Sequence, residues 1–321
     1  MPLAPILMKP AYRHGAATPW GGSRLRELYQ KDTPDPRTGE SLEVSAIPTL
    51  NSMDQDGTPL GRLIERYGKS LLGTEVKGEF PLLLKLLDAR EPLSVQVHPN
   101  DEYARKHENK LGKTEAWIIL HAEPDAKLVY GLREGVSRDS LRQAMERGTA
   151  VEDLLRYVPV QKGDVYFIPA GTVHAIGAGI VLYEIQQSSD VTYRFYDWER
   201  RDPQGNKRQL HVRQALDVSD LDVRLDKVVP RSLPIPGGEG QLELLLQNPL
   251  FETYRYRACT GVPLPPDLRR FSMLTAVAPF TLRWGEDKAL DVPAGQTVFL
   301  PALGEDLLLT GAEALLSRPA V

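Results

Sequence analysis

The stretch that decides the fold runs from Gly163 to His174 and reads Gly-Asp-Val-Tyr-Phe-Ile-Pro-Ala-Gly-Thr-Val-His. Its β-branched and aromatic run, Asp164–Ile168, predicts a short strand. The Pro-Ala-Gly that follows predicts a tight turn, which delivers His174 at the head of the returning strand. This stretch therefore predicts a β-hairpin that presents one histidine at a fixed place.

A weaker copy of the same pattern lies near the C-terminus. Residues Gly295–Asp306 repeat the glycine, phenylalanine, proline and alanine at the same offsets, but Asp306 stands where the first copy has His174. Such a repeat indicates two similar barrels. The segment Arg224–Gly240, with three prolines and three glycines, is the expected linker. We therefore expect one domain over residues 1–225, and a linker with a second domain over residues 226–321.

The rest of the chain predicts a mainly β protein. Periodic apolar residues predict a helix over Pro59–Leu72 and a small helical insertion around residues 137–157. The remaining segments are short, β-branched or aromatic, and punctuated by Gly, Pro and Asp, which is typical of a barrel or sandwich of antiparallel strands. The strands expected in the first half are 42–48, 82–87, 93–98, 116–121, 128–130, 164–168, 180–186 and 192–196.

Composition excludes several classes of protein. The 321 residues carry 39 Lys and Arg against 43 Asp and Glu, a net charge of −4, which argues against nucleic acid as the main partner. No apolar run reaches the ~18 residues of a membrane helix, and the N-terminus lacks the basic lead of a signal peptide. The single cysteine, Cys259, excludes an internal disulfide and a thiolate metal cluster. We expect a cytoplasmic protein without nucleic-acid or membrane partners.

Polar side chains gather on three of the expected strands. Ser94, Gln96 and His98 alternate with valines and therefore share one strand face, while Lys113 and Glu115 share a face at the start of an apolar strand. Burying an unpaired Glu115 would be costly, so a metal or another cation is expected beside it. The segment Ser94–His98 alone is equally compatible with a solvated strand face, and Glu115 alone favours a strand-end glutamate in water. Together with His174 they predict a mixed nitrogen and oxygen site for Zn²⁺, Mn²⁺, Fe²⁺ or Co²⁺.

These motifs resemble a known family. Gly163–His174 matches the second sequence motif of the cupin superfamily through its histidine. The wider set resembles type I mannose-6-phosphate isomerases (phosphomannose isomerases), and the shared segments are Lys9-Pro10, Trp20–Gly22, Gln96–Asp101, Lys113–Glu115, Pro169–His174 and Glu184–Trp198. The resemblance covers roughly residues 9–200. In the first cupin motif this sequence has Gln-x-His where other cupins have His-x-His, and this difference is typical of the isomerase family. It implies two cupin-type jelly-roll barrels, the second without metal.

The resemblance also implies an activity and a site. The family interconverts mannose 6-phosphate and fructose 6-phosphate, so a sugar phosphate is the expected partner. One Zn²⁺ per chain is expected on Gln96, His98, Glu115 and His174. Arg194 and Lys113 are the expected catalytic residues, and they also offer cations to the substrate phosphate. Ser94 and Glu184 are expected to contact substrate, with Lys113 or Arg194 as the partner of the Glu184 carboxylate.

The chemistry of an aldose–ketose isomerisation agrees with these residues. A proton moves between C1 and C2 through an enediol, which requires a base and a cation beside the oxygens. The sequence does not decide whether Lys113, a zinc-bound water or His98 displaced from the metal is the base. Asp190 and Asp197 flank Arg194 and are expected either to orient it or to be ordinary turn or ion-pair residues. His14, His107 and His121 are expected on the surface or in structural roles, and His211 is expected to cap or pack near a final helix.

Two other functions remain compatible with the same residues. An iron-dependent cupin oxygenase would use His98, Glu115 and His174 as its two histidines and one carboxylate. A non-catalytic, sugar-binding protein with two cupin barrels would explain the loss of metal residues in the second half. The sequence leaves the oligomeric state and the direction of the physiological reaction open.

Overall fold

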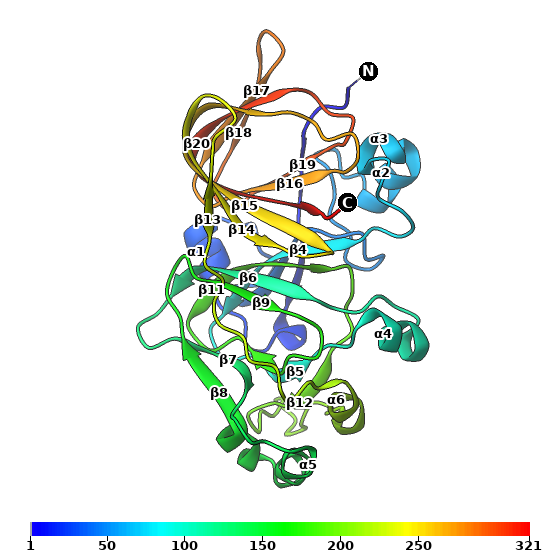
Figure 1. Cartoon of the computed structure of the whole chain (residues 1–321), viewed down its shortest axis with the longest axis vertical. Coiled ribbons are helices and arrows are strands. Elements are labelled where there is room, and N and C mark those ends of the chain that lie inside the picture. The colour runs from blue at the N-terminus through cyan, green and yellow to red at the C-terminus, as the bar shows by residue number, and fades with distance from the viewer. Residues whose placement is uncertain (1) are drawn as a thin grey trace.

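Antiparallel strands form three sheets in the computed structural model, which describes residues 2–321 (Figure 1). The first half contains a six-stranded sheet in the order β2-β3-β4-β11-β6-β9 and a five-stranded sheet in the order β12-β5-β10-β7-β8. The six-stranded sheet consists of β2 (Ala11–His14), β3 (Thr38–Val44), β4 (Leu82–Ala89), β6 (Glu115–Ala122), β9 (Val165–Ile168) and β11 (Ile180–Gln187). The five-stranded sheet consists of β5 (Val95–Val97), β7 (Lys127–Leu132), β8 (Leu155–Pro159), β10 (His174–Ala175) and β12 (Tyr193–Tyr196).

The second half forms one nine-stranded sheet that wraps around its own core (Figure 1). Its strands are β1 (Ile6–Leu7), β13 (Arg231–Leu233), β14 (Glu239–Gln247), β15 (Phe251–Leu264), β16 (Ser272–Ala276), β17 (Phe280–Trp284), β18 (Lys288–Val292), β19 (Thr297–Leu300) and β20 (Leu307–Pro319). The first strand of the chain joins this sheet, because Ile6 pairs with Phe299. The predicted mainly β fold is confirmed, while the division at residue 225 stays a prediction.

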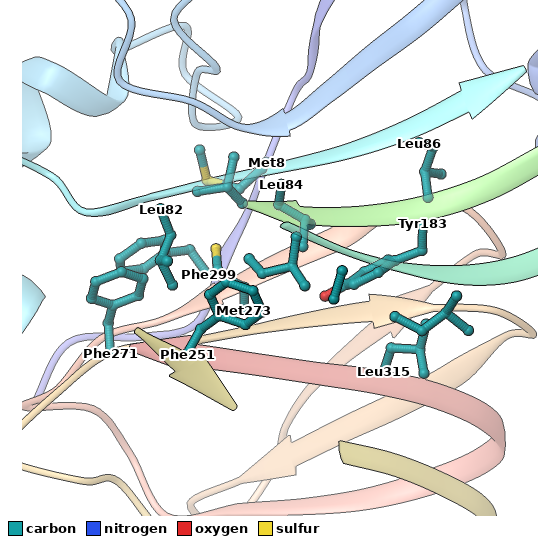
Figure 2. Packing of buried hydrophobic residues seen from close by; sticks show 14 of the residues in the cluster. Met8, Leu82, Leu84, Leu86, Tyr183, Phe251, Phe271, Met273, Phe299 and Leu315 are labelled. Atoms are coloured by element: carbon teal, nitrogen blue, oxygen red, sulfur yellow. The ribbon is translucent and has the colours of Figure 1, made fainter. Parts of the chain in front are cut away.

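The six-stranded sheet is buried on both faces. Along β4, Leu82, Leu84 and Leu86 point away from the first barrel and contact Phe251, Met273 and Leu315 of the second half (Figure 2). The alternate residues Lys85 and Leu87 point into the first barrel. The second half therefore covers a face of this sheet. This double burial explains why leucines occupy both faces of β4, with Lys85 and Asp88 as its only charged residues.

Helices cover the ends of the sheets and the outer face of the five-stranded sheet. The predicted helix over Pro59–Leu72 is broken at Gly68, whose φ of +49° ends α2 and separates it from α3. The predicted insertion becomes α5 and a 3-10 turn, but its last three residues, Leu155–Tyr157, belong to strand β8. No helix in the described residues is long and apolar enough to cross a membrane. The helices are α1 (Arg24–Tyr29), α2 (Leu60–Tyr67), α3 (Lys69–Leu72), α4 (Asp101–Glu108), α5 (Arg138–Arg147) and α6 (Val212–Val218), with 3-10 helices η1 (Gly15–Ala17) and η2 (Thr149–Leu154).

Candidate metal and substrate site

Three of the predicted site residues meet inside the first barrel. His98 follows β5, Glu115 begins β6 and His174 begins β10, so the two sheets contribute from opposite sides. One possible ligand atom from each residue lies within 4.8 Å of the others, and all three side chains are buried. Val95 and Val97 pack on the outer face of β5, so Gln96 faces inward, as the alternation predicts.

Backbone carbonyls fix the orientation of both histidines. The Nδ1 atom of His98 lies 2.9 Å from the carbonyl oxygen of Val191, and Nδ1 of His174 lies 2.8 Å from that of Thr172. A carbonyl only accepts hydrogen bonds, so each Nδ1 carries the proton and each Nε2 keeps a free lone pair. Both Nε2 atoms point to Glu115, at 3.7 Å for His98 and 3.3 Å for His174.

Electrostatics keep both imidazoles neutral. Burial lowers the pKa of His174 to about 3, and burial together with the charge of Lys113 holds the pKa of His98 well below its usual range. Neutral imidazole is the form that binds a metal. Both Nε2 atoms are unprotonated and lie beside a carboxylate, so neither imidazole would have to lose a proton before it coordinates a metal.

Glu115 is a buried carboxylate between the two histidines and Lys113. The side chain is fully buried, and its Oε1 accepts no hydrogen bond from residues 2–321. Burial raises its pKa to about 7, although Lys113 Nζ lies 2.7 Å from Oε2 and opposes this rise. An unsatisfied buried carboxylate is costly. A divalent metal beside Glu115 and two neutral imidazoles would satisfy it, so the residues present fit such an ion.

Gln96 lies at the edge of this cluster. It pairs with His174 across the sheet, and its Nε2 lies 3.4 Å from His174 Nε2. Rotation of the Gln96 amide by about 180° would place its oxygen where its Nε2 now lies. Lys113 Nζ lies on the other side, 3.1 Å from His98 Nε2.

A second group of buried polar side chains lies on strands β4, β6 and β11. Lys85 Nζ lies 3.1 Å from Glu184 Oε1, and Trp117 Nε1 donates to Glu184 Oε2 at 3.0 Å. Burial alone would raise the pKa of Glu184, but the charges of Lys85 and Lys113 lower it to about 2. The prediction that Lys113 or Arg194 pairs directly with Glu184 is therefore wrong, because Lys85 is its cross-strand neighbour. The signal was present: Lys85 interrupts an otherwise apolar strand.

A cleft with a cavity volume of about 110 Å³ lies beside the cluster, since it is lined by Gln96 and Lys113, which contact His174 and His98. Ser94, Gln96, Lys113, Glu184 and Arg194, all predicted site residues, line it. Its walls carry more cationic than anionic side chains, namely Arg13, Lys85, Lys113, Arg194 and Arg208 against Glu40, Glu184 and Asp190. This excess suits a phosphate ester.

Arg194 has a donor left over for a ligand. It pairs with Gln96 across strands β12 and β5, which places it on the cleft face. Its Nη1 donates to the carbonyl of Gln209 at 3.1 Å, whereas its buried Nε has no partner among residues 2–321. Burial and the nearby charge of Arg208 lower its pKa.

The predicted orienting residues contact other side chains. Asp190 pairs with Lys110 at 2.6 Å, and Asp197 accepts from Arg200 and Arg208. Of the two roles expected for these aspartates, the structure therefore shows that of ion-pair residues, and neither forms an ion pair or hydrogen bond with Arg194 within residues 2–321. Instead, Nδ1 of His211, the residue directly before α6, accepts the backbone N–H of Arg194 at 3.1 Å.

Comparisons with known proteins agree with this geometry. The family model for the catalytic domain of type I phosphomannose isomerase matches residues 11–125. The mannose-6-phosphate isomerase of Streptococcus mutans is 41% identical over 249 residues, which cover 76% of this chain and 77% of the relative. The crystal structure of the Bacillus subtilis mannose 6-phosphate isomerase superposes with a TM-score of 0.89 at 30% identity, covering 98% of this chain and 99% of that chain.

A more distant structure, a mannose 6-phosphate isomerase bound with zinc and yttrium, has a TM-score of 0.78 at 17% identity and covers 99% of this chain and all (100%) of that chain. At that identity the likeness supports the fold alone. The match to the Streptococcus mutans enzyme is closer and extends over most of both chains. On this evidence the chain belongs to the type I mannose-6-phosphate isomerase family, and it is an isomerase.

Proposed function

We propose that this chain interconverts mannose 6-phosphate and fructose 6-phosphate through an enediol, with one zinc ion per chain. The observation that carries the proposal is the buried His98–Glu115–His174 cluster at the base of a cationic cleft. The names of the relatives and the zinc found in one distant structural neighbour support it.

The proposed ligands are Gln96, His98, Glu115 and His174. Zinc bound there would supply a Lewis acid that stabilises negative charge on a substrate oxygen beside the reacting carbons. The d¹⁰ ion suits a reaction that moves a proton and no net electrons. The hydrogen bonds from both Nδ1 atoms to carbonyls would hold the imidazoles in place for it.

The cleft residues have separate tasks in this proposal. Arg194 offers its unpartnered Nε to the phosphate, while the buried Glu184 carboxylate, held ionised by Lys85, accepts hydrogen bonds from sugar hydroxyls. Ser94, the residue directly before β5, supplies a further hydroxyl contact in the cleft. Lys113 reaches both the cluster and the cleft, which makes it the side chain best placed to move the proton between C1 and C2.

The test is a coupled assay of fructose 6-phosphate formed from mannose 6-phosphate, before and after chelation and after zinc is restored. We expect turnover that chelation abolishes and zinc restores. Absence of turnover by the zinc-loaded chain would refute the proposal. Elemental analysis tests the alternatives: stoichiometric iron with oxygen uptake would favour the oxygenase, and failure to bind any metal would favour the non-catalytic sugar-binding protein.

A further inference from the structure

The second barrel contains a hollow of its own, far in sequence from the cluster described above. Its cavity volume is about 240 Å³, and it opens into the apolar core that Leu242, Leu264 and Leu316 share. Tyr254 and Tyr256 form part of its wall, with several prolines around the rim. A concave, mainly apolar pocket with a few converging polar groups is the usual form of a small-molecule site.

Strand register shows that this hollow corresponds to the metal site of the first barrel. Glu115 begins β6 and pairs with Ile168, the last residue of β9 before Pro169. Ser272 likewise begins β16 and pairs with Leu300, the last residue of β19 before Pro301. The glycines that open the two repeated motifs, Gly163 and Gly295, both have positive φ, at +93° and +82°.

The register extends to the strand on the other side. Gln186 of β11 pairs with Glu115, and Met273 pairs with Ser317 of β20, which places Arg318 beside Ser272. The position of the buried carboxylate is thus taken by a serine hydroxyl, and a guanidinium lies next to it. The second barrel therefore has a hollow at the equivalent position, where hydrogen-bond donors stand in place of the metal-binding side chains of the first barrel.

Charges around the hollow balance one another. Arg270 donates through Nε to Asp267 and through Nη1 to Glu252, and Arg318 donates to the other oxygen of Glu252. Arg269 completes the ion pairing on Asp267, and Glu305 lies at the rim, so three arginines face three carboxylates. An anionic ligand would find no net positive charge here, in contrast to the cleft of the first barrel.

Several donors are nevertheless left free. Arg270 Nη2, Arg318 Nη1 and the hydroxyls of Tyr256 and Ser272 have no hydrogen-bond partner among residues 2–321. This network of arginines and carboxylates offers polar contacts to the edge of a ring, and the tyrosine and proline side chains beside it offer apolar contacts to the face of the ring.

We propose that this hollow is a second binding site, and that it takes an uncharged, hydroxyl-bearing ring, which is the chemistry of an unphosphorylated sugar. The site is separate from the isomerase site, so its occupancy does not depend on the function proposed above. The balanced charges exclude a preference for a phosphorylated or carboxylated sugar.

The experiment is a ligand-observed NMR titration of the full chain with two matched probes. Methyl α-D-glucopyranoside is uncharged and cannot open to the reactive aldehyde, and methyl α-D-glucopyranosiduronate is the same ring with a carboxylate. Ser272→Phe fills the hollow, and Ser232→Phe makes the same change on an exposed position of edge strand β13 as the control. Tyr256→Phe removes only a hydroxyl and keeps the packing if the larger change prevents folding.

We expect saturable binding of the neutral ring, weaker binding of the charged ring, and loss of binding in Ser272→Phe but not in Ser232→Phe. Tyr256→Phe should weaken binding about 2- to 12-fold, the effect of one hydrogen bond. The proposal is overturned if the neutral ring does not saturate, if the charged ring binds at least as tightly, or if binding survives Ser272→Phe and disappears in His174→Ala. Isomerase activity should be the same as in the wild type in Ser272→Phe, Ser232→Phe and Tyr256→Phe.

Discussion

Replacement of His174 by alanine should separate the metal site from the fold. The imidazole is completely buried, with Nδ1 held by the Thr172 carbonyl at 2.8 Å and Nε2 3.3 Å from Glu115. Structural zinc binding is worth ~10–16 kcal/mol for four protein ligands, so one ligand corresponds to roughly 2.5–4 kcal/mol. His174→Ala should therefore weaken zinc binding by ~10²–10³-fold.

The loss of activity should follow the loss of zinc. We expect the purified variant to contain far less than one zinc per chain and to show no turnover at zinc concentrations that saturate the wild type. The fold should persist, because the metal-free variant loses one hydrogen bond and one buried side chain, a cost of ~1–3 kcal/mol. Zinc is measured by competition with a chromophoric chelator, activity by the coupled assay, and the fold by circular dichroism.

His121→Ala is the matched control, since His121 lies on the same strand as Glu115 but outside the cluster. It should keep both zinc and activity. The reasoning fails if His174→Ala binds zinc within tenfold of the wild type. If instead zinc is lost and turnover remains, the ligand assignment holds and the need for metal in the reaction is refuted.

Three further outcomes are expected. Arg194→Met should lower kcat/KM by ~10–150-fold with the fold unchanged, the value of one charge-assisted hydrogen bond, and a loss under threefold in steady-state kinetics would contradict its role. Leu84→Ala, at a fully buried position facing the second barrel, should lower the free energy of unfolding by ~2–5 kcal/mol in urea titrations, while Leu28→Ala at a 45% exposed position should cost little. Burial raises the pKa of Asp88 from 3.8 to about 6, so the folded chain binds this proton more tightly and its stability falls as pH rises between these values. Asp88→Asn lacks that loss and should gain roughly 2 kcal/mol relative to wild type between pH 4 and pH 8 in thermal unfolding, and a constant difference would contradict the shift.

The parts of the site that depend on residues close together in the sequence could be predicted. Gln96 and His98 lie two residues apart, as do Lys113 and Glu115, and strand alternation alone places each pair on one face. The structure brings His98, Glu115 and His174 together as expected. The resemblance to a family supplied what alternation could not, namely that these three strands enclose the same space.

Contacts that depend on register between strands could not be predicted. Lys85 meets Glu184 because β4 and β11 pair in one particular register, and a shift by one residue would turn Lys85 to the other face. The two aspartates near Arg194 share its segment, but their partners Arg200, Arg208 and Lys110 all lie outside the strands, where neither alternation nor register predicts a contact. Local sequence shows that a buried charge needs a partner, but it does not show which strand supplies it.

The two faces of the six-stranded sheet connect stability to catalysis. Along β11, Tyr183 and Ile185 pack toward the second barrel, and Tyr183 donates to Ser317 of β20 at 2.7 Å. Between them Glu184 faces the cleft, where Lys85 and Trp117 hold it. Because successive residues of one strand point to opposite faces, any shift of β11 against the second barrel would also move Glu184 relative to Lys85. The second barrel thus contributes to the site without contacting it. Its packing against the apolar face of the six-stranded sheet holds the strands that carry Lys85 and Glu184 on the opposite face.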